Sequence, residues 1–396
     1  MDNPAAAGAR AIGLAAAASL VGAFTLAAHA RETCAPATVW TAPGSGPVDT
    51  TQILTRAAGA QVTLLGENHD DPDHHRWELQ TVAALAALHP KLVLGFEMFP
   101  RRVQTVLDRW VAGDLNESAF LKLSDWSQVW GTDATFYLPL FQFARINRIP
   151  IVALNVERSF TRTVNKKGLA AVPKDKREGV SEPAAASEAY LARLFEVYSR
   201  HPFEKNSTPA RSDPAFHHFV EAQLVWDRAM AQALAGAAAR HPDALVVGVM
   251  GSRHIAHGDG VPHQLDNLGI KRIVSLLPWD ADADCSDLSP DLATAVFGLP
   301  ARPPQPATPP QPLLGIQIEA VANGVRVVAV KPGSVASASG LQTDDVLTEA
   351  AGTAVKTTGE LKAIVVRMAP GTWLPLKATR NGKSIELTAR FPPAEK

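Results

Sequence analysis

The chain has 396 residues, of which 46% are hydrophobic and 19% charged, and its formal net charge is −1. This length exceeds that of one ordinary domain and predicts at least two. The balanced charge excludes the basic excess that is typical of nucleic-acid-binding proteins, so we expect no nucleic-acid partner.

The first thirty residues have the features of a secretory signal peptide. Arg10 provides a positive charge, residues 11–28 are small and apolar, and Ala28-His29-Ala30 matches a cleavage site. The alternative is an uncleaved anchor, since a run of about 18 apolar residues lies near the lower limit for a membrane span. We expect cleavage and export, which would make the protein periplasmic or envelope-associated. A lipid anchor is not expected, because the residues before Cys34 are not the small ones of a lipobox.

The chain contains two cysteines, Cys34 and Cys285, which flank the first predicted domain. An exported protein reaches an oxidising compartment, where disulfides persist. One hypothesis is therefore a disulfide that ties the mature N-terminus to the end of this domain. The alternative is two free thiols, because the distance between the cysteines cannot be deduced from the sequence.

The first strand-to-helix junction of the chain is rich in potential ligands. An apolar run at 62–65 predicts a buried strand, and a helix is predicted from about Asp73, a candidate N-cap, to Leu88. Ligands of open α/β sheets bind at the carboxyl ends of strands, so this junction is a candidate site for a metal or cofactor. The alternative is an ordinary polar loop. Four side chains at the junction carry this chemistry: Glu67, His69, His74 and His75.

Further apolar runs alternate with helical segments along the first domain. Strands are predicted at 91–98, 149–155, 244–250 and 272–277, and a long amphipathic helix at 213–239. This alternation predicts an α/β domain with a mainly parallel sheet covered by helices on both faces.

Several of these strands end in a polar side chain. Parallel strands share one carboxyl edge, so we expect Glu67 with His69, Glu97, Asn155 and His254 to converge there. Two carboxylates and two imidazoles suit a divalent transition metal or acid–base chemistry. Tyr137 is a candidate axial haem ligand, since Tyr and His both serve in that role. Further candidates for a haem site or its cleft are His75, Asn155, His257 and His263.

Motifs spread over residues 55–280 resemble the ChaN-like haem-binding uptake family. They include Leu65-Gly66-Glu67-Asn68-His69 with His75, Gly95 to Phe99, the aromatic block at 126–139, Ala153 to Val156, the segment at 221–231 and the loop at 251–265. The resemblance implies binding of haem iron at the cell envelope, in iron acquisition. The chain departs from the family in lacking a lipobox, in the bulky Arg253 and in His263-Gln264.

The family resembles a wider group that includes Tiki-type metalloproteases and erythromycin esterases. This group shares a strand-end Glu/His pair, a second Glu and a late Gly-x-x-His. Membership implies a hydrolase or peptidase that uses a divalent metal (Mn, Zn or Co). Here Glu67, His69 and His254 would be the metal ligands, and Glu97 would activate water or complete the coordination.

The C-terminal part of the chain resembles a bacterial PDZ domain. Leu313-Leu314-Gly315-Ile316 matches the carboxylate-binding loop, the motifs at 332–336 and 340–341 match the later signature, and Asn381-Gly382 predicts a hairpin. The resemblance implies that an extended peptide or a protein C-terminus binds as an added strand, held by Leu314, Gly315 and Ile316. The alternative is a PDZ fold that serves as a docking wall or dimer contact.

The sequence therefore predicts a signal peptide at 1–30, a ChaN-like haem- or metal-binding domain at 31–298, a stiff Pro-rich linker at 299–312 and a PDZ domain at 313–396. The favoured function is that of an exported haem-iron-binding protein with a peptide-binding PDZ domain. The alternatives are a metal-dependent hydrolase and an adaptor with a catalytically silent first domain. A homodimer that sandwiches the ligand is left open.

Overall fold

The computed structural model describes residues 34–200, 209–302 and 312–393. The predicted signal peptide and most of the Pro-rich linker lie outside these residues. The chain divides into two compact units, Met1–Ala301 and Arg302–Lys396, which are described separately. Within the described ranges, no helix combines the length and the apolar character needed to cross a membrane.

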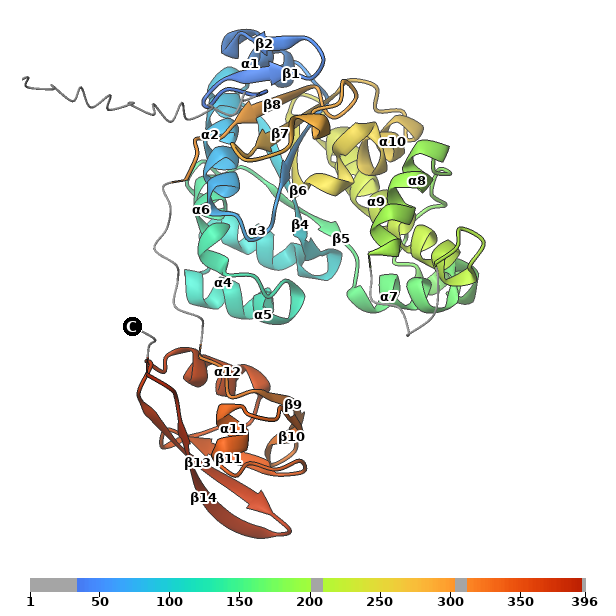
Figure 1. Cartoon of the computed structure of the whole chain (residues 1–396). Coiled ribbons are helices and arrows are strands. Elements are labelled where there is room, and N and C mark those ends of the chain that lie inside the picture. Colours follow the sequence, from blue (N-terminus) through green and yellow to red (C-terminus); the bar gives the residue numbers. More distant parts are fainter. Residues whose placement is uncertain (1–33, 201–208, 303–311, 394–396) are drawn as a thin grey trace, which may run out of the picture. The chain divides into compact units, whose positions relative to one another are not determined.

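The first unit contains an eight-stranded sheet of order β2-β1-β8-β7-β3-β6-β4-β5 (Figure 1). Six strands run parallel to one another: β3 (Val62–Glu67), β4 (Leu92–Pro100), β5 (Ile151–Asn155), β6 (Leu245–Gly251), β7 (Ile273–Trp279) and β8 (Ala295–Gly298). Two short strands, β1 (Trp40–Ala42) and β2 (Gly46–Val48), add an antiparallel edge. The predicted fold class is confirmed, although β1, β2 and β8 are too short to give a periodic signal.

Both faces of this sheet are buried. Leu65 and Val247 point into one apolar cluster, while their neighbours Leu64 and Val246 point into another. Such alternation fills a core on each side of a strand and explains the near-continuous apolar runs. The first cluster is covered by α1 (Thr50–Ala58), α2 (Pro72–Leu88), α3 (Gln104–Ala112), α4 (Glu117–Leu123), α5 (Trp126–Val129) and α6 (Leu138–Ile146), the second by α9 (Pro214–Arg240) and α10 (Gly260–Asn267). Two further helices, α7 (Arg158–Lys167) and α8 (Glu188–Ser199), pack against α9.

Helix α2 begins earlier than its sequence pattern predicts. Asp71, not Asp73, is the N-cap, and its side chain accepts hydrogen bonds from the backbone N–H groups of Asp73 and His74. Pro72 occupies the first helical position, where its missing N–H costs nothing and its fixed φ suits the helix. The prediction of Asp73 as the cap was therefore wrong. The earlier start places His74 and His75 within the first turns, with both side chains buried.

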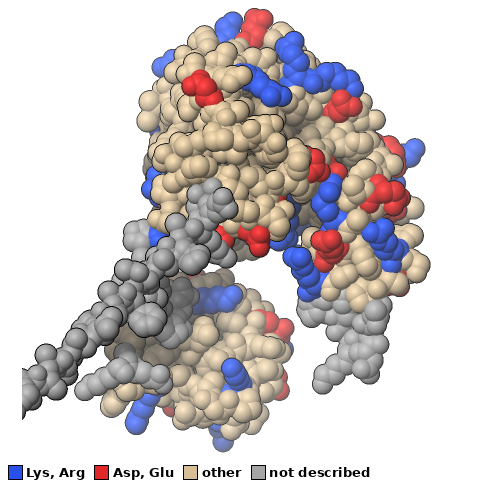
Figure 2. Space-filling view, turned by 45° about the horizontal axis from the view of Figure 1, so that its top comes forward, with Lys and Arg blue, Asp and Glu red and all other residues tan. Residues whose placement is uncertain are grey.

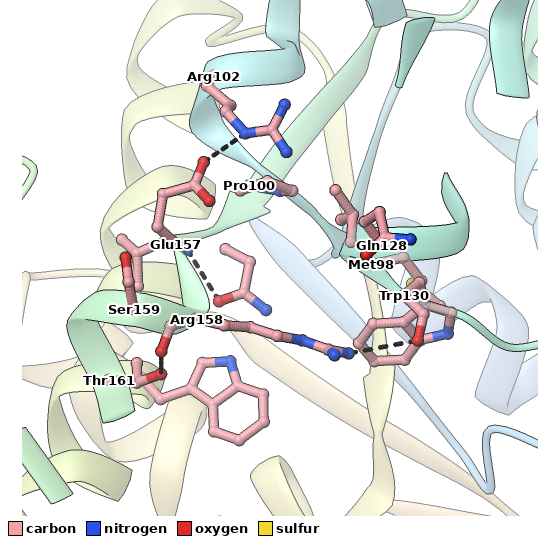
Figure 3. Close-up of a pocket in the computed structure, with 13 residues that line it drawn as sticks. Met98, Pro100, Arg102, Gln128, Trp130, Glu157, Arg158, Ser159 and Thr161 are labelled. Carbon is pink, nitrogen blue, oxygen red and sulfur yellow. Dashed lines mark hydrogen bonds and ion pairs between the residues drawn. The ribbon is translucent and has the colours of Figure 1, made fainter. Parts of the chain in front are cut away.

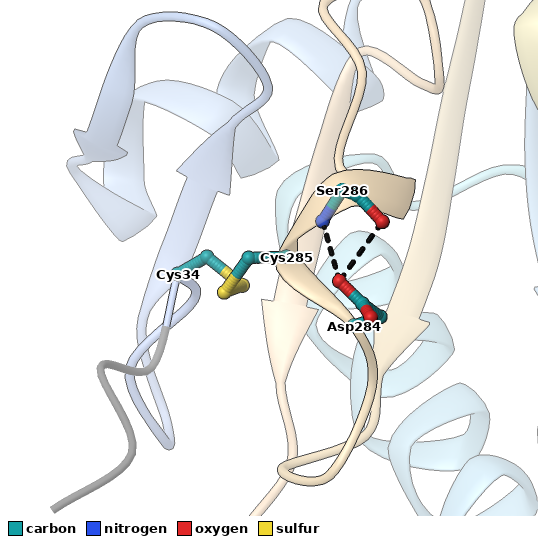
Figure 4. Close-up of a disulfide and its surroundings, with 4 residues drawn as sticks. All are labelled: Cys34, Asp284, Cys285 and Ser286. Atoms are coloured by element: carbon teal, nitrogen blue, oxygen red, sulfur yellow. Dashed lines mark hydrogen bonds between the residues drawn. A yellow bond between two sulfur atoms is a disulfide. The ribbon is translucent and has the colours of Figure 1, made fainter.

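A disulfide joins Cys34 to Cys285 (Figure 4). Cys34 precedes β1, and Cys285 opens the short 3-10 helix η7 (Cys285–Asp287). The bond therefore fastens the start of the described chain to the segment between β7 and β8, as the first hypothesis for the two cysteines predicted.

The second unit is an antiparallel sheet of order β14-β13-β11-β10-β9, with β12 paired to β11. Its strands are β9 (Ile316–Val321), β10 (Gly324–Val330), β11 (Val346–Ala350), β12 (Thr353–Ala354), β13 (Trp373–Arg380) and β14 (Lys383–Arg390). Two helices, α11 (Val335–Ala338) and α12 (Thr358–Val366), close a separate apolar core. The predicted hairpin at Asn381-Gly382 joins β13 to β14.

One buried ion pair stabilises this small unit. Asp345 is 1% exposed, and its two carboxylate oxygens accept hydrogen bonds of 2.7 Å from Nε and Nη2 of Arg380. The backbone N–H of Gln342 donates a further hydrogen bond of 2.9 Å to Asp345. Burial favours the neutral acid, but these hydrogen bonds outweigh it and lower the pKa of Asp345.

We expect Asp345→Asn to destabilise the second unit by about 1.5–3 kcal/mol, the usual range for hydrogen bonds to charged groups. Because the folded-state pKa lies below the unfolded value, this contribution is present above about pH 4 and is lost as the pH falls through the folded pKa. Calorimetry of the whole protein should show a lower transition temperature for the second unit alone. The control is Asp344→Asn at the exposed neighbouring position. Equal effects of the two substitutions would contradict the role assigned to the ion pair.

Candidate functional site

The carboxyl end of β3 carries a buried carboxylate with three partners. Oε1 of Glu67 lies 2.5 Å from Nδ1 of His69 and accepts a 2.7 Å hydrogen bond from the hydroxyl of Tyr137. Oε2 lies 3.2 Å from Nδ1 of His75. Burial opposes ionisation of Glu67, but the hydrogen bonds with His69 and His75 outweigh it and lower its pKa to about 2. Glu67 is therefore an anion that holds two imidazoles and a phenol in place.

His75 is shared between two buried carboxylates on α2 and β3. Its Nδ1 also lies 3.0 Å from Oε2 of Glu78, whose side chain is fully buried. Burial lowers the pKa of His75, but the two carboxylates raise it to about 10. Burial, with the adjacent charge of Glu67, raises the pKa of Glu78 well above its usual value. Glu67 is therefore the anion of this cluster and His75 its cation, and the raised pKa of Glu78 favours its neutral form.

Tyr137 is held inside the same cluster. Its side chain is 0% exposed, and its oxygen accepts a 3.3 Å hydrogen bond from Nε1 of Trp130 while donating to Glu67. Burial and the charge of Glu67 raise the pKa of Tyr137, so the phenol keeps its proton. In this arrangement the phenol oxygen is occupied by hydrogen bonds and closed off from solvent.

A second carboxylate–imidazole pair stands after β6. His254, at the end of the 3-10 helix η5 (Ser252–His254), lies with Nδ1 2.6 Å from Oδ1 of Asp227 on α9. The hydroxyl of Tyr190 donates a 2.8 Å hydrogen bond to the other oxygen of Asp227. Burial lowers the pKa of His254, but Glu97 and Asp227 raise it to about 9. In both imidazoles of the site, His69 and His254, Nδ1 therefore lies in hydrogen-bond range of a buried carboxylate.

Glu97 on β4 lies between the two pairs. Its Oε2 accepts a 2.7 Å hydrogen bond from the backbone N–H of Gly251, and its Oε1 lies 3.6 Å from Nε2 of His254. Oε1 is buried and has no hydrogen-bond partner among the described residues. A Cβ at Gly251 would lie 3.0 Å from the His69 ring and 3.7 Å from Glu97 Oε2, so glycine avoids a tight contact with His69 here. The predicted convergence of strand ends is therefore present, and Glu97, like Glu67, has one oxygen without a hydrogen-bond partner among the described residues.

His69 is the most open imidazole of the cluster. Its side chain is 39% exposed and stands edge-on to the ring of Trp130, with 4.7 Å between ring centres. Among the described residues, no hydrogen-bond partner is found for its Nε2. With Nδ1 bound to Glu67, His69 has the geometry of an imidazole whose second nitrogen can bind a metal or haem iron.

A pocket of about 260 Å³ opens beside these groups at the ends of β4 and β5 (Figure 3). Trp130 and Trp226 form part of its wall, and Trp226 also contacts the His254 ring, with 4.8 Å between centres. Asn155 lines the pocket while its Nδ2 donates a hydrogen bond to the carbonyl of Glu97. Arg158 lines the wall as well, and its Nη2 donates to the carbonyl of Trp130. The pocket therefore combines aromatic faces with a cation next to the histidine cluster.

Of the residues predicted for the site of the first unit, Asn155 is the one that lines this pocket, and His69 and His254 reach it through their ring contacts with Trp130 and Trp226. His257 is paired with Asp291, at 3.2 Å, and His263 on α10 lies 2.9 Å from the carbonyl of Ala185. Within the described part of the chain, two groups offer three ligand atoms within 4.8 Å of one another: Glu67 with His75 and Glu78, and Asp71 with His74 and Asp280. The predicted set of Glu67, His69 and His254 is not one of them.

The cluster around His74 does not have free metal-binding nitrogens. Nδ1 of His74 accepts a 2.9 Å hydrogen bond from the backbone N–H of Asn68. A neutral imidazole that accepts at Nδ1 carries its proton on Nε2, the atom 3.2 Å from Asp280. His74 therefore donates to the carboxylates and ties α2 to the end of β7.

The second unit has its own groove, of about 570 Å³, between β9 and α12. Leu314, Gly315 and Ile316, the predicted peptide-binding residues, line it together with Leu361 and Val365. The carbonyls of Leu314 and Gly315 accept hydrogen bonds from the N–H groups of Ala336 and Lys331, which fixes the loop before β9.

The charged side chains of the described surface are mixed in sign. On the face turned to the viewer in Figure 2, Lys and Arg lie among Asp and Glu over the first unit, in line with the net charge of −1.

Comparison with known proteins identifies both units. The family described as haem-binding uptake, Tiki superfamily, ChaN, matches residues 53–265, more than half of the chain. The chain belongs to this family. A PDZ domain matches residues 312–390. No match is found among curated proteins.

One solved structure shares the ChaN fold, and others match only about a fifth of the chain. The structure described as cofacial heme binding to ChaN of Campylobacter jejuni is 18% identical, with a TM-score of 0.50, and the match covers 65% of this chain and 95% of that one. A serine endoprotease from Yersinia pestis is 22% identical over 20% of this chain and 30% of its own, with a TM-score of 0.18. The HtrA-type protease AlgW with a decapeptide is 22% identical over 21% of this chain and 30% of its own, with a TM-score of 0.20.

Sequence reasoning missed several residues of the ChaN-like site. Asp227 lies in the middle of α9 and Glu78 in the middle of α2, and both are 0% exposed. A carboxylate on the apolar side of a helix is a signal that could have revealed them, because buried charges need partners. Arg158 and Trp226 carry no such signal, since their place in the pocket depends on how α7 and α9 pack.

Proposed function

We propose that the ChaN-like domain binds haem iron through His69 at the pocket beside Trp130. The observation that carries the proposal is the partly exposed imidazole of His69. Its Nδ1 is hydrogen-bonded to the buried carboxylate of Glu67, and its Nε2 has no protein partner among the described residues. A carboxylate at Nδ1 fixes the ring and makes the other nitrogen a stronger ligand. Bound haem would supply an iron centre for which histidine is a usual axial ligand.

The surroundings of His69 fit a large, flat, anionic ligand. Trp130 and Trp226 offer aromatic faces, and Arg158 offers a cation for carboxylates. A pocket of about 260 Å³ is smaller than the usual site for a drug-sized ligand. A macrocycle would therefore remain partly outside the pocket, and a second copy of the chain is a candidate to cover it, as a homodimer.

A haemin titration of the mature protein, followed by visible absorbance, tests this function. We expect a saturable shift of the Soret band at micromolar haemin. A shift that grows linearly without saturation would indicate nonspecific haemin binding and contradict the proposal.

We further propose that the protein is exported and acts in haem or iron acquisition, with the PDZ domain binding an extended peptide or a protein C-terminus. The signal-like residues 1–30 and the disulfide support an oxidising compartment, such as the periplasm or envelope. Protease protection in intact and lysed cells tests the location.

A second candidate function is that of a divalent-metal-dependent hydrolase or peptidase. The observation that favours it is the unpartnered oxygen of Glu97 next to Nε2 of His254. A buried carboxylate and a neighbouring imidazole form a mixed oxygen and nitrogen donor set that fits Mn, Zn or Co. Because the pKa of His254 is raised to about 9, a metal at Nε2 would have to displace a proton. Asp227 would keep Nε2 of His254 directed at Glu97.

We expect Asp227→Asn to lower the affinity for a divalent metal by about 10–100-fold, the usual effect of removing a partner of a ligating histidine. Titration calorimetry with Mn, Zn and Co measures this directly. If wild-type protein binds none of these metals at the site, or if the variant binds them equally well, the hydrolase candidate fails.

A further inference from the structure

The groove of the second unit lies along an unpaired strand edge. β9 pairs with β10 on one side and is the terminal strand of its sheet. The opposite wall is α12, which contributes Leu361, Val365 and Val366. An extended peptide can therefore add to β9 and bury apolar side chains against α12.

The direction of such a peptide follows from the loop before β9. In the described part of the chain, the N–H groups of Leu314 and Gly315 donate to no backbone acceptor. They can bind a terminal carboxylate, and β9 runs away from them. A peptide whose C-terminus lies at this loop therefore runs antiparallel to β9, and its earlier residues pass Ile316 and Ile318.

The charges along the groove have one sign. Lys331 and Lys362 are the charged residues that line it, both are exposed, and neither pairs with a carboxylate among the described residues. By contrast, Lys377 on β13 is paired with Glu349. The backbone N–H of Lys331 donates to the carbonyl of Gly315, which places Lys331 at the carboxylate end. Lys362 stands on the helical wall, one turn before Val365 and Val366.

We propose that this groove selects protein C-termini that end in an apolar residue and carry an acidic side chain two or three positions earlier. The inference rests on the proposed peptide-binding function and adds a specificity to it. The groove follows β9 from Ile316 to Ile318, roughly 10 Å of strand, or about three residues. An acidic side chain within that reach complements the ammonium group of Lys362.

Fluorescence anisotropy with the full mature chain tests the proposal. The probe is a labelled hexapeptide with a free C-terminal valine and glutamate two positions before it. Matched peptides carry glutamine or lysine in place of the glutamate, or a C-terminal amide. We expect each of these changed peptides to bind about 2–5-fold more weakly than the glutamate peptide, the range for an exposed ion pair. We expect added salt to reduce this difference in affinity.

Charge reversal at Lys362 distinguishes a specific ion pair with this residue from a general electrostatic attraction between peptide and protein. We expect Lys362→Glu to invert the preference between the glutamate and lysine peptides while the glutamine peptide still binds, which shows that the variant is folded. The control Lys383→Glu, at an exposed position on β14 outside the groove, should keep the wild-type preference. Failure of every free-carboxylate peptide to bind would sink peptide binding itself. Binding without acidic preference, or a preference that Lys362→Glu leaves unchanged, would overturn this inference alone.

Discussion

Replacement of His69 by alanine is expected to reduce haemin affinity by at least about 100-fold, since removing only the partner of a ligating histidine already costs 10–100-fold. The substitution removes the partly exposed imidazole and leaves the buried cluster largely intact. Glu67 keeps the hydroxyl of Tyr137 and the ring of His75 as partners. A haemin titration measures the loss, and calorimetry should show nearly unchanged unfolding.

The matched control for this experiment is His263→Ala. His263 is an imidazole on the same domain, but its Nε2 lies near the carbonyl of Ala185, away from the pocket. Its removal should leave haemin affinity unchanged. Equal losses for the two variants would indicate a nonspecific role of histidines in haemin binding and contradict the assignment of His69.

The second large effect is expected on the stability of the first unit. Glu67→Ala should destabilise the first unit by about 3–5 kcal/mol, because it leaves a cationic His75 and a phenol buried without their anion. Denaturant unfolding followed by tryptophan fluorescence measures this difference.

Glu78→Gln is the control for the charges of the cluster. If Glu78 is the neutral member, as its raised pKa indicates, an amide of the same shape should change stability by less than about 1 kcal/mol. A cost as large as that of Glu67→Ala would mean that Glu78 is ionised in the folded protein, and the assigned charges would be wrong.

The sequence predicts which residues meet in the site better than it predicts what each one does. Buried strands end at Glu67 and Asn155, Glu97 lies near the end of β4, and the loop after β6 carries His254, so parallel strands must bring them to one edge. Their roles depend on distances of a few ångströms. Oε2 of Glu67, predicted as a metal ligand, lies 3.2 Å from Nδ1 of His75, and Oε1 of Glu97 lies 3.6 Å from Nε2 of His254. Neither oxygen has a hydrogen-bond partner among the described residues.

The contributions of helices to the site could not be predicted in the same way. Asp227 reaches His254 from α9, which packs on β4, β5 and β6. Tyr137 reaches Glu67 from the N-cap of α6, which packs against α2 and α3. Sequence periodicity gives the buried side of a helix but not its position along the sheet. His257 and His263 show the converse, since they share a loop region with His254 but have other partners.

Exchange of the proposed ligand tests the central claim most directly. The visible and electron paramagnetic resonance spectra of the ferric haem complex should be recorded for wild-type protein and for His69→Cys. Histidine and cysteinate ligands set haem electronics differently. If His69 ligates the iron, the variant spectrum changes to that of a thiolate-ligated haem. A saturated complex whose spectrum is unchanged by His69→Cys would show that another residue holds the iron.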